Sequence, residues 1–284
     1  MSAQLLYARS GNEAVEINPS TGATIALVTS GSDWYWTVFS VMAATTLGYV
    51  VLMAFVPRRE RFFHYLSVGA ALFSSIAYFT MASNLGWAAV ETEFGHQQGG
   101  GERQVFYARY IGWFMSAPLI MLNLSFFAGV DWVTALFTAM AVNVYIIGGL
   151  VGAVVSTTYK WGYWTIGVAA WCLVVYQLVW VSMRSLNELT SVTVEPKIRT
   201  WYRLIIGGVV FIYSLYPICW GLSEGGNVIT PTSEGVFYGV LDLIALPILN
   251  TAVLLASRKL DIEELGLGIP AARTESVPEK TPVA

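Results

Sequence analysis

Two charged side chains stand alone inside apolar stretches of this sequence. Arg109 lies between Ala108 and Tyr110, and Asp242 lies in a run of valine, leucine, isoleucine and alanine. A charge at membrane depth costs roughly 2.5–3.5 kcal/mol even on insertion scales. Arg109 and Asp242 are therefore predicted to form an ion pair. Such a pair serves either to tie two helices together or as the remnant of a proton path.

Two further carboxylates, Glu224 and Glu234, flank a short polar connection between two apolar stretches. Carboxylates at such a place are ordinarily solvated. The alternative interpretation is a proton-release cluster at the surface of the molecule.

Aromatic residues recur at three- and four-residue spacings in one stretch, which places them on one face of a helix. The set consists of Tyr213, Tyr216, Pro217 and Trp220. Trp113 and Trp164 are expected to face the same interior. Because aromatics within a helical bundle more often pack than bind, the set predicts either a packed core or a ligand pocket.

No residue arrangement typical of catalysis or metal binding accompanies these features. His64 and His96 are isolated, so the sequence predicts neither an enzyme nor a metal site. Cys172 and Cys219 lie in apolar runs, where a thiol behaves as a small hydrophobe, and no disulfide is predicted.

The composition and the lengths of the apolar stretches predict the helices that position these residues. The 284 residues are 56% hydrophobic and 12% charged, and the mean hydropathy is +0.60, which calls for lipid as the solvent. A helix needs about 20 apolar residues to cross a bilayer, and seven stretches reach that length. They cover approximately residues 33–56, 63–88, 105–127, 131–156, 161–183, 201–222 and 233–257.

Basic residues predict how these helices are oriented. Arg58, Arg59 and Arg61 follow the first stretch, and Arg258 and Lys259 follow the seventh. Positive charge favours the cytoplasmic side, which places the N-terminus outside. We therefore expect an extracellular segment over residues 1–32, a bundle over 33–258 and a disordered cytoplasmic tail over 259–284. With a net charge of -3 and no basic face, nucleic acid is not an expected partner.

The stretch from Arg109 to Asn123, which includes Tyr110, Trp113, Ser116 and Pro118, resembles the third helix of microbial rhodopsins. Tyr216, Pro217 and Trp220 look like their sixth helix, and Leu241-Asp242 looks like their seventh. The similarity covers about residues 33–258. It implies an all-α membrane protein with a seven-transmembrane-helix bundle of the microbial rhodopsin type.

Three positions depart from the family pattern. The resemblance places the lysine that holds retinal at Leu246, the primary proton acceptor at Gly112 and the proton donor at Asn123. The chain's lysines are Lys160, Lys197, Lys259 and Lys280, all in expected loops or the tail. Since an alkyl side chain forms no imine, no covalent cofactor is expected. These losses also argue against pumping.

The chain looks like a fungal opsin-related protein, a branch that lacks this lysine and includes heat-shock-type plasma-membrane members. This resemblance implies a non-pumping role in stress or in regulation and sensing, with lipid, a membrane-protein partner or a second copy as partners. The alternatives are an ion or proton transporter and a receptor for a non-covalent hydrophobic ligand such as a retinoid. The pocket would be lined by Trp113, Ser116, Trp164, Tyr213, Tyr216, Pro217, Trp220, Asp242 and Leu246, unless Trp171 fills it.

Overall fold

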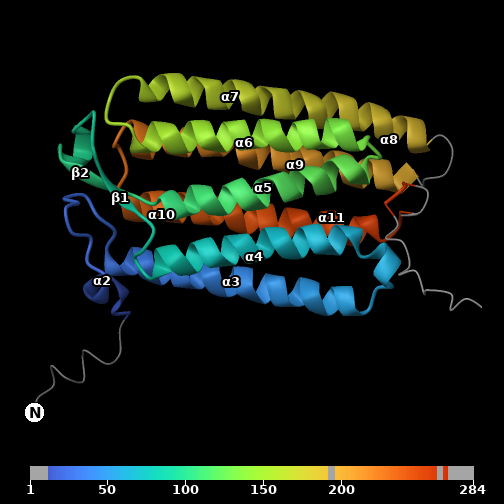
Figure 1. Cartoon of the computed structure of the whole chain (residues 1–284), viewed down its shortest axis with the longest axis horizontal. Coiled ribbons are helices and arrows are strands. Elements are labelled where there is room, and N and C mark those ends of the chain that lie inside the picture. The colour runs from blue at the N-terminus through green and yellow to red at the C-terminus, as the bar shows by residue number, and fades with distance from the viewer. Residues whose placement is uncertain (1–11, 191–195, 261–264, 268–284) are drawn as a thin grey trace, which may run out of the picture.

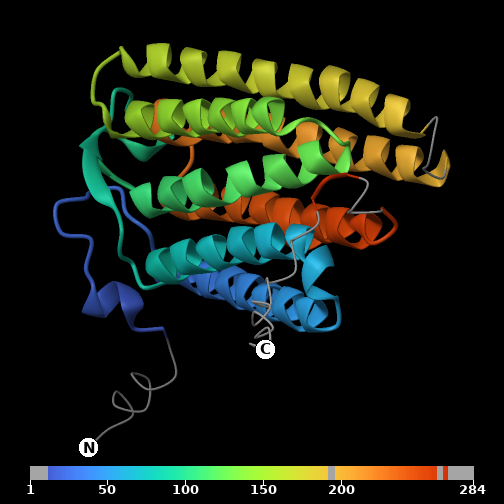
Figure 2. The same cartoon turned by 45° about the vertical axis from the view of Figure 1, so that its right-hand side comes forward.

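Seven helical spans form the body of the molecule. The structure is a computed structural model of the chain, and it describes residues 12–190, 196–260 and 265–267. Within these residues, seven helical stretches are long and apolar enough to cross a membrane. Figures 1 and 2 show them running side by side, with a small β-hairpin at one end. The predicted all-α architecture with seven spans is confirmed.

Four spans are uninterrupted α-helices. They are α3 (Thr29–Ala54), α4 (Phe62–Ala82), α5 (Tyr107–Phe127) and α6 (Trp132–Val154). Buried residues of α3 recur every three or four positions at Tyr35, Val38 and Met42, while the other faces carry apolar residues that suit lipid. α5 packs between α4 and α6, which gives its residues a central position.

The remaining three spans each contain a π-helical turn, a feature often found at functional sites. The fifth span joins α7 (Lys160–Tyr176), η3 (Gln177–Ser182) and α8 (Met183–Thr190). The sixth joins α9 (Pro196–Trp220) and η4 (Gly221–Gly225). The seventh joins α10 (Pro231–Leu243), η5 (Ile244–Asn250) and α11 (Thr251–Ser257). Pro247 lies within η5, where it lacks a backbone donor.

Short elements close the two ends of the bundle. β1 (Ala88–Glu91) pairs antiparallel with β2 (Glu102–Val105), in a register that places Val90 opposite Arg103. α2 (Ala14–Ile17) and the 3₁₀ turn η2 (His96–Gln98) accompany this hairpin, and we call this side of the molecule the hairpin end. The 3₁₀ turn η1 (Arg58–Glu60) and α8 lie at the opposite end (Figure 1).

Several boundaries differ from the prediction. The second helix was expected to reach residue 88 but ends at Ala82, because Asn84 and Gly86 adopt positive φ angles of 55° and 71°. The fifth span continues past residue 183 to Thr190. The link between the second and third spans contains the paired strands β1 and β2. α3 begins at Thr29, before the expected residue 33, and most of the expected tail over 259–284 lies outside the described residues.

Candidate functional site

A buried ion-pair cluster lies at the hairpin end of the bundle. Arg109, in the first turn of α5, and Glu234, in the first turn of α10, are 1% and 0% exposed. Arg109 Nη1 donates to Glu234 Oε1, and Nη2 donates to the Tyr35 hydroxyl at 2.7 Å. The same guanidinium lies 3.6 Å from Glu224 Oε1. Both carboxylates are therefore interior groups, and the interpretation of Glu224 and Glu234 as solvated is wrong.

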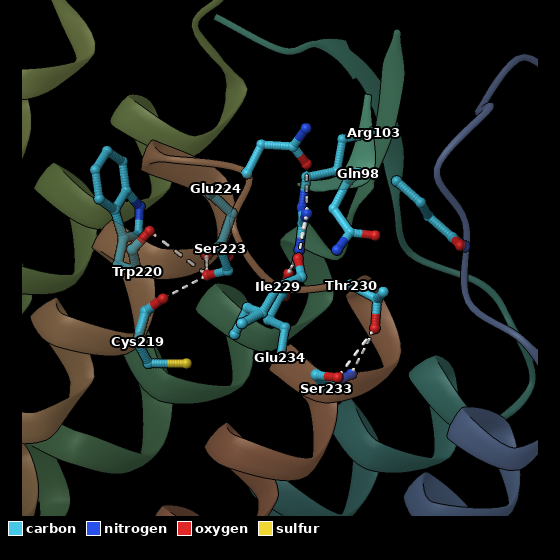
Figure 3. Close-up of polar contacts among 12 residues, drawn as sticks. Gln98, Arg103, Cys219, Trp220, Ser223, Glu224, Ile229, Thr230, Ser233 and Glu234 are labelled. Carbon is cyan, nitrogen blue, oxygen red and sulfur yellow. Dashed lines mark hydrogen bonds and ion pairs between the residues drawn. The ribbon is translucent and has the colours of Figure 1, made fainter. Parts of the chain in front are cut away.

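Arg103 on β2 reaches into the same cluster, although no sequence pattern singled it out. Its Nη2 donates to Glu234 Oε2 at 2.7 Å, and its Nη1 donates to Asn227 Oδ1 and to the Ile229 carbonyl, each at 2.8 Å. Figure 3 shows Arg103 reaching down from the hairpin toward Glu234. Each oxygen of Glu234 thus has its own arginine, and the hairpin is fixed to the start of α10.

Glu224 is held by hydroxyl groups and lies beside a lysine. Tyr110 donates to Oε1 at 2.8 Å, and Ser223 donates to Oε2 (Figure 3). Lys160 Nζ donates to the backbone carbonyl of Glu224 at 3.1 Å and lies 3.8 Å from Glu93. Lys160 was expected in a loop, but it is the first residue of α7 and only 2% exposed.

The predicted ion pair between Arg109 and Asp242 is wrong. Both oxygens of Asp242 accept hydrogen bonds from neutral donors: Trp113 Nε1 at 3.0 and 3.1 Å, the Tyr216 hydroxyl at 2.6 Å and the Tyr78 hydroxyl at 2.5 Å. The reason is the position of Glu234 on the same span. Glu234 precedes Asp242 by eight residues, which is about 12 Å along a helix, and it lies at the level of Arg109.

Asp242 forms part of the wall of an aromatic cavity in the middle of the bundle. The centre of a water-sized sphere can move through about 50 Å³ of this cavity. On the same measure, this volume is several times the minimum that holds one water molecule. The structure brings all nine residues of the expected pocket to this cavity: Trp113, Ser116, Trp164, Tyr213, Tyr216, Pro217, Trp220, Asp242 and Leu246. Tyr145 and Tyr238 add to the wall, and neither was singled out from the sequence.

Trp171 does not fill this cavity. Its ring stacks on Tyr213 with centroids 5.5 Å apart, and its Nε1 donates to Ser214 Oγ at 3.0 Å. Trp171 therefore supports the wall from behind Tyr213, and the space beside Leu246 stays open.

Gly112 and Asn123 both lie on α5, and neither lines this cavity. Gly112 lines a second void of about 10 Å³ together with Arg109, Trp113 and Asp242. Asn123 Nδ2 donates to Ser67 Oγ and to Asn250 Oδ1, each at 3.1 Å. The polar groups that Asn123 contacts are thus neutral amides and hydroxyls.

The two histidines stay apart from this site. His64 is buried in the first turn of α4 at the end opposite the hairpin, and the ring of His96 lies tilted against that of Phe94 in the hairpin link. In the described part of the chain, no group of three or more histidine, cysteine or acidic residues is placed to hold a metal ion.

Comparison with known proteins identifies the family. The model of the bacteriorhodopsin-like proteins matches residues 29–249. The opsin-like protein carO of Fusarium fujikuroi is 42% identical over 271 residues, which cover 93% of this chain and 86% of that protein. The 30 kDa heat shock protein of Saccharomyces cerevisiae is 37% identical, with 86% of this chain and 78% of that protein covered.

A solved structure agrees with this assignment. The light-driven proton pump LR (Mac) of Leptosphaeria maculans superposes with a TM-score of 0.76 at 27% identity, covering 84% of this chain and 98% of that one. The family match, the relatives and the shared bundle agree with the resemblance seen in the sequence. This chain belongs to the bacteriorhodopsin-like family of seven-helix membrane proteins.

Proposed function

We propose that this chain is a non-pumping opsin-like protein of the plasma membrane with a role in stress or regulation. In this proposal, the aromatic cavity takes a hydrophobic ligand without a covalent bond. The observation that carries the proposal is Leu246, which lines the cavity four residues after Asp242. The resemblance expects the retinal-bearing lysine there, and a leucine has no nitrogen for an imine.

The rest of the proton path supports the same proposal. A pump needs an acceptor and a donor that change protonation during its cycle. Gly112 has no side chain, and Asn123 is an amide held by Ser67 and Asn250. The positions of the family's proton acceptor and donor therefore hold no titratable side chain in this chain, although charged groups remain at the hairpin end.

The relatives support the biological role. One relative is named an opsin-like protein and another a 30 kDa heat shock protein, and both match over most of this chain. We propose that the hairpin end faces the outside, because Arg58, Arg59 and Arg258 lie at the other end of the bundle.

A reconstitution with retinal tests the proposal. The chain is purified in the presence of all-trans retinal, washed, and treated with hydroxylamine, which cleaves retinal imines. We expect no visible absorption band that survives washing. A stable band that hydroxylamine bleaches would contradict the proposal.

Mass spectrometry of copurifying lipids tests the ligand cavity separately. Trp220 lines the cavity, and its Nε1 donates to the Gly149 carbonyl at 2.9 Å. Trp220→Ala should change which hydrophobic molecules copurify with the protein. Trp180→Ala is the matched control, because Trp180 is 65% exposed on the lipid-facing surface, and it should leave the profile unchanged. Identical profiles for all three proteins would count against a ligand.

A further inference from the structure

A groove lies between the short helix α2 and the spans α3 and α4 at the hairpin end, where Figure 1 shows α2 beside the start of α3. It is lined by residues of the segment 12–18, by Trp36 of α3 and by Ser83, which follows α4. The centre of a water-sized sphere can move through about 400 Å³ of this groove. The groove shares no lining residue with the aromatic cavity, so it is a second and separate space.

Two asparagines hold the wall of this groove in place. Asn12 Nδ2, just before α2, donates to Ser32 Oγ at 2.6 Å. Asn18 Nδ2, just after α2, donates to the Ser83 carbonyl at 2.9 Å, and Asn84 Nδ2 donates back to the Asn18 carbonyl at 2.7 Å. The segment between the two asparagines is therefore tied to α3 and to the end of α4, and the groove is part of the fold.

An aromatic cluster continues from the groove along α3 and α4. The ring of Trp36 lies edge to face with the rings of Phe39 and Phe79, with centroids 5.7 and 5.5 Å away. Phe39 and Phe79 also lie edge to face, with centroids 5.5 Å apart. Phe79 is 49% exposed, so the cluster is open to lipid. It offers a rigid apolar surface on which a hydrocarbon chain can pack.

The groove lies at the depth of the lipid head groups. The 26 residues of α3 extend about 39 Å, which is longer than the roughly 30 Å hydrocarbon core of a bilayer. Asp33, in the second turn of α3, is exposed, and a charged side chain at that place needs the polar interface. Phe39 and Phe79 instead suit hydrocarbon. Trp36 lies between these two levels, where tryptophan is enriched in membrane proteins.

Two polar side chains of the groove have no hydrogen-bond or ion-pair partner among the described residues. They are the exposed carboxylate of Glu13 and the Nε1–H group of Trp36. The indole of Trp34, two residues earlier, differs in this respect, because its Nε1 donates to the Gly235 carbonyl at 3.0 Å. The groove thus presents one anion and one hydrogen-bond donor. A zwitterionic head group offers the complement, an ammonium for the carboxylate and phosphate oxygens for the indole.

We propose that this groove binds a phospholipid with a zwitterionic head group, namely phosphatidylcholine. The quaternary ammonium lies against Glu13 and the indole ring of Trp36, since aromatic rings attract such cations. The phosphate accepts a hydrogen bond from Trp36 Nε1, and an acyl chain packs on Phe39 and Phe79. This site goes beyond the proposed function, because it uses none of the residues of the ligand cavity.

The charge of the head group decides the selectivity of this site. Phosphatidylglycerol carries the same phosphate and acyl chains but has no ammonium, so its negative charge faces Glu13 without compensation. One charge contact at an exposed place changes affinity by about twofold to fivefold. The groove is therefore expected to prefer phosphatidylcholine over phosphatidylglycerol by that factor.

Photocrosslinking of the full chain in lipid nanodiscs tests this preference at the groove itself. The nanodiscs contain equal parts of the two lipids, and a trace of one of them carries a diazirine in its acyl chain. Label on peptides that cover residues 12–18 and 36–39 is divided by the label on the whole chain. We expect the phosphatidylcholine probe to label these peptides about twofold to fivefold more than the phosphatidylglycerol probe does.

Two substitutions separate the roles of the two groups. Glu13→Gln should bring the labelling ratio of the two probes close to one. Glu16→Gln is the matched control, because Glu16 is an exposed carboxylate of the same helix that does not line the groove, and it should keep the ratio. Trp36→Phe should lower labelling by both probes, since both lipids carry the phosphate. Trp132→Phe, at a tryptophan that is 67% exposed on α6, should change neither value.

Three results would overturn the proposal. The first is equal labelling of the groove by the two probes on the unmodified chain. The second is a ratio that falls as far in Glu16→Gln as in Glu13→Gln, which would mean that the general charge of this end repels anionic lipid. The third is labelling that neither Glu13→Gln nor Trp36→Phe changes. None of these results bears on the ligand cavity, which the retinal and copurification experiments test.

Discussion

A Cβ atom placed on Gly112 would lie 2.5 Å from the Cβ atom of Ala77. The two residues face each other from α5 and α4, beside the small void near Asp242. At that separation one of the two helices must shift. The position that the resemblance assigns to the family's proton acceptor is therefore closed to any side chain unless Ala77 gives way.

Gly112→Ala is predicted to destabilise the protein by about 1–3 kcal/mol, the usual cost of overpacking. Ala77→Gly in the same chain should recover most of that loss. The control is Gly207→Ala, since a Cβ on Gly207 in α9 meets nothing within 4 Å and alanine favours the helix. Thermal unfolding in detergent measures all four proteins. A Gly112→Ala protein as stable as the parent would show that the helices separate freely.

Glu234→Gln is predicted to cost about 3–5 kcal/mol, because it leaves two buried guanidinium groups without their shared carboxylate. Glu188→Gln makes the same chemical change at a carboxylate that is 69% exposed and pairs with Arg184. An exposed pair of this spacing contributes about 0.5 kcal/mol or less. Equal unfolding temperatures for the two variants would mean that the hairpin-end cluster does not hold the fold together.

The sequence predicted the seven spans well, because the thickness of the bilayer requires each spanning helix to be long and apolar, and both properties are visible in the sequence. The sequence did not predict which side chains from distant segments meet in the folded bundle. The expected partner of Arg109 was Asp242, since both lie in apolar runs, whereas the structure places Glu234 and Glu224 at its level. Arg103 was not recognised because, in the sequence, it looks like an ordinary charged residue of a loop. In the structure it lies in the hairpin at the end of the bundle, where it is buried.

Asp131, the N-cap of α6, is predicted to make a pH-dependent contribution to the stability of the fold. Its carboxylate accepts hydrogen bonds from the Thr134 and Val133 backbone amides at 3.0 and 3.1 Å. The bonds to Thr134, followed by the backbone bond to Val133, lower the pKa of Asp131 below its usual value. A lowered pKa stabilises the fold above the unfolded value of about 3.9, and this contribution is lost as the pH falls through the lowered pKa.

Asp131→Ala should therefore cost about 1 kcal/mol at neutral pH through loss of the helix cap. Asp131→Asn keeps a capping oxygen and should remove the acid dependence that this residue contributes. Unfolding temperatures measured from pH 7 down to pH 3 check both expectations. If the parent and Asp131→Asn lose stability in parallel over that range, the cap is not the cause.

Proton movement through the protein is predicted to be absent. Asn123 and the groups around it are neutral, so a proton at Asp242 has no titratable group to reach at the family's donor position. Liposomes carrying the protein and a trapped pH dye should respond to an imposed gradient as protein-free liposomes do, in darkness and in light. Flux that depends on the protein and falls with Asp242→Asn would support passive conduction instead.

The most direct test of the central claim is the mass of the intact protein after incubation with all-trans retinal and reduction with borohydride, which makes any imine permanent. Leu246→Lys serves as the matched positive control, since its amine would enter the cavity one turn from Asp242. The predicted result is an unchanged mass for the parent chain and one added retinyl group for Leu246→Lys. A stoichiometric retinyl adduct on the parent chain would contradict the account.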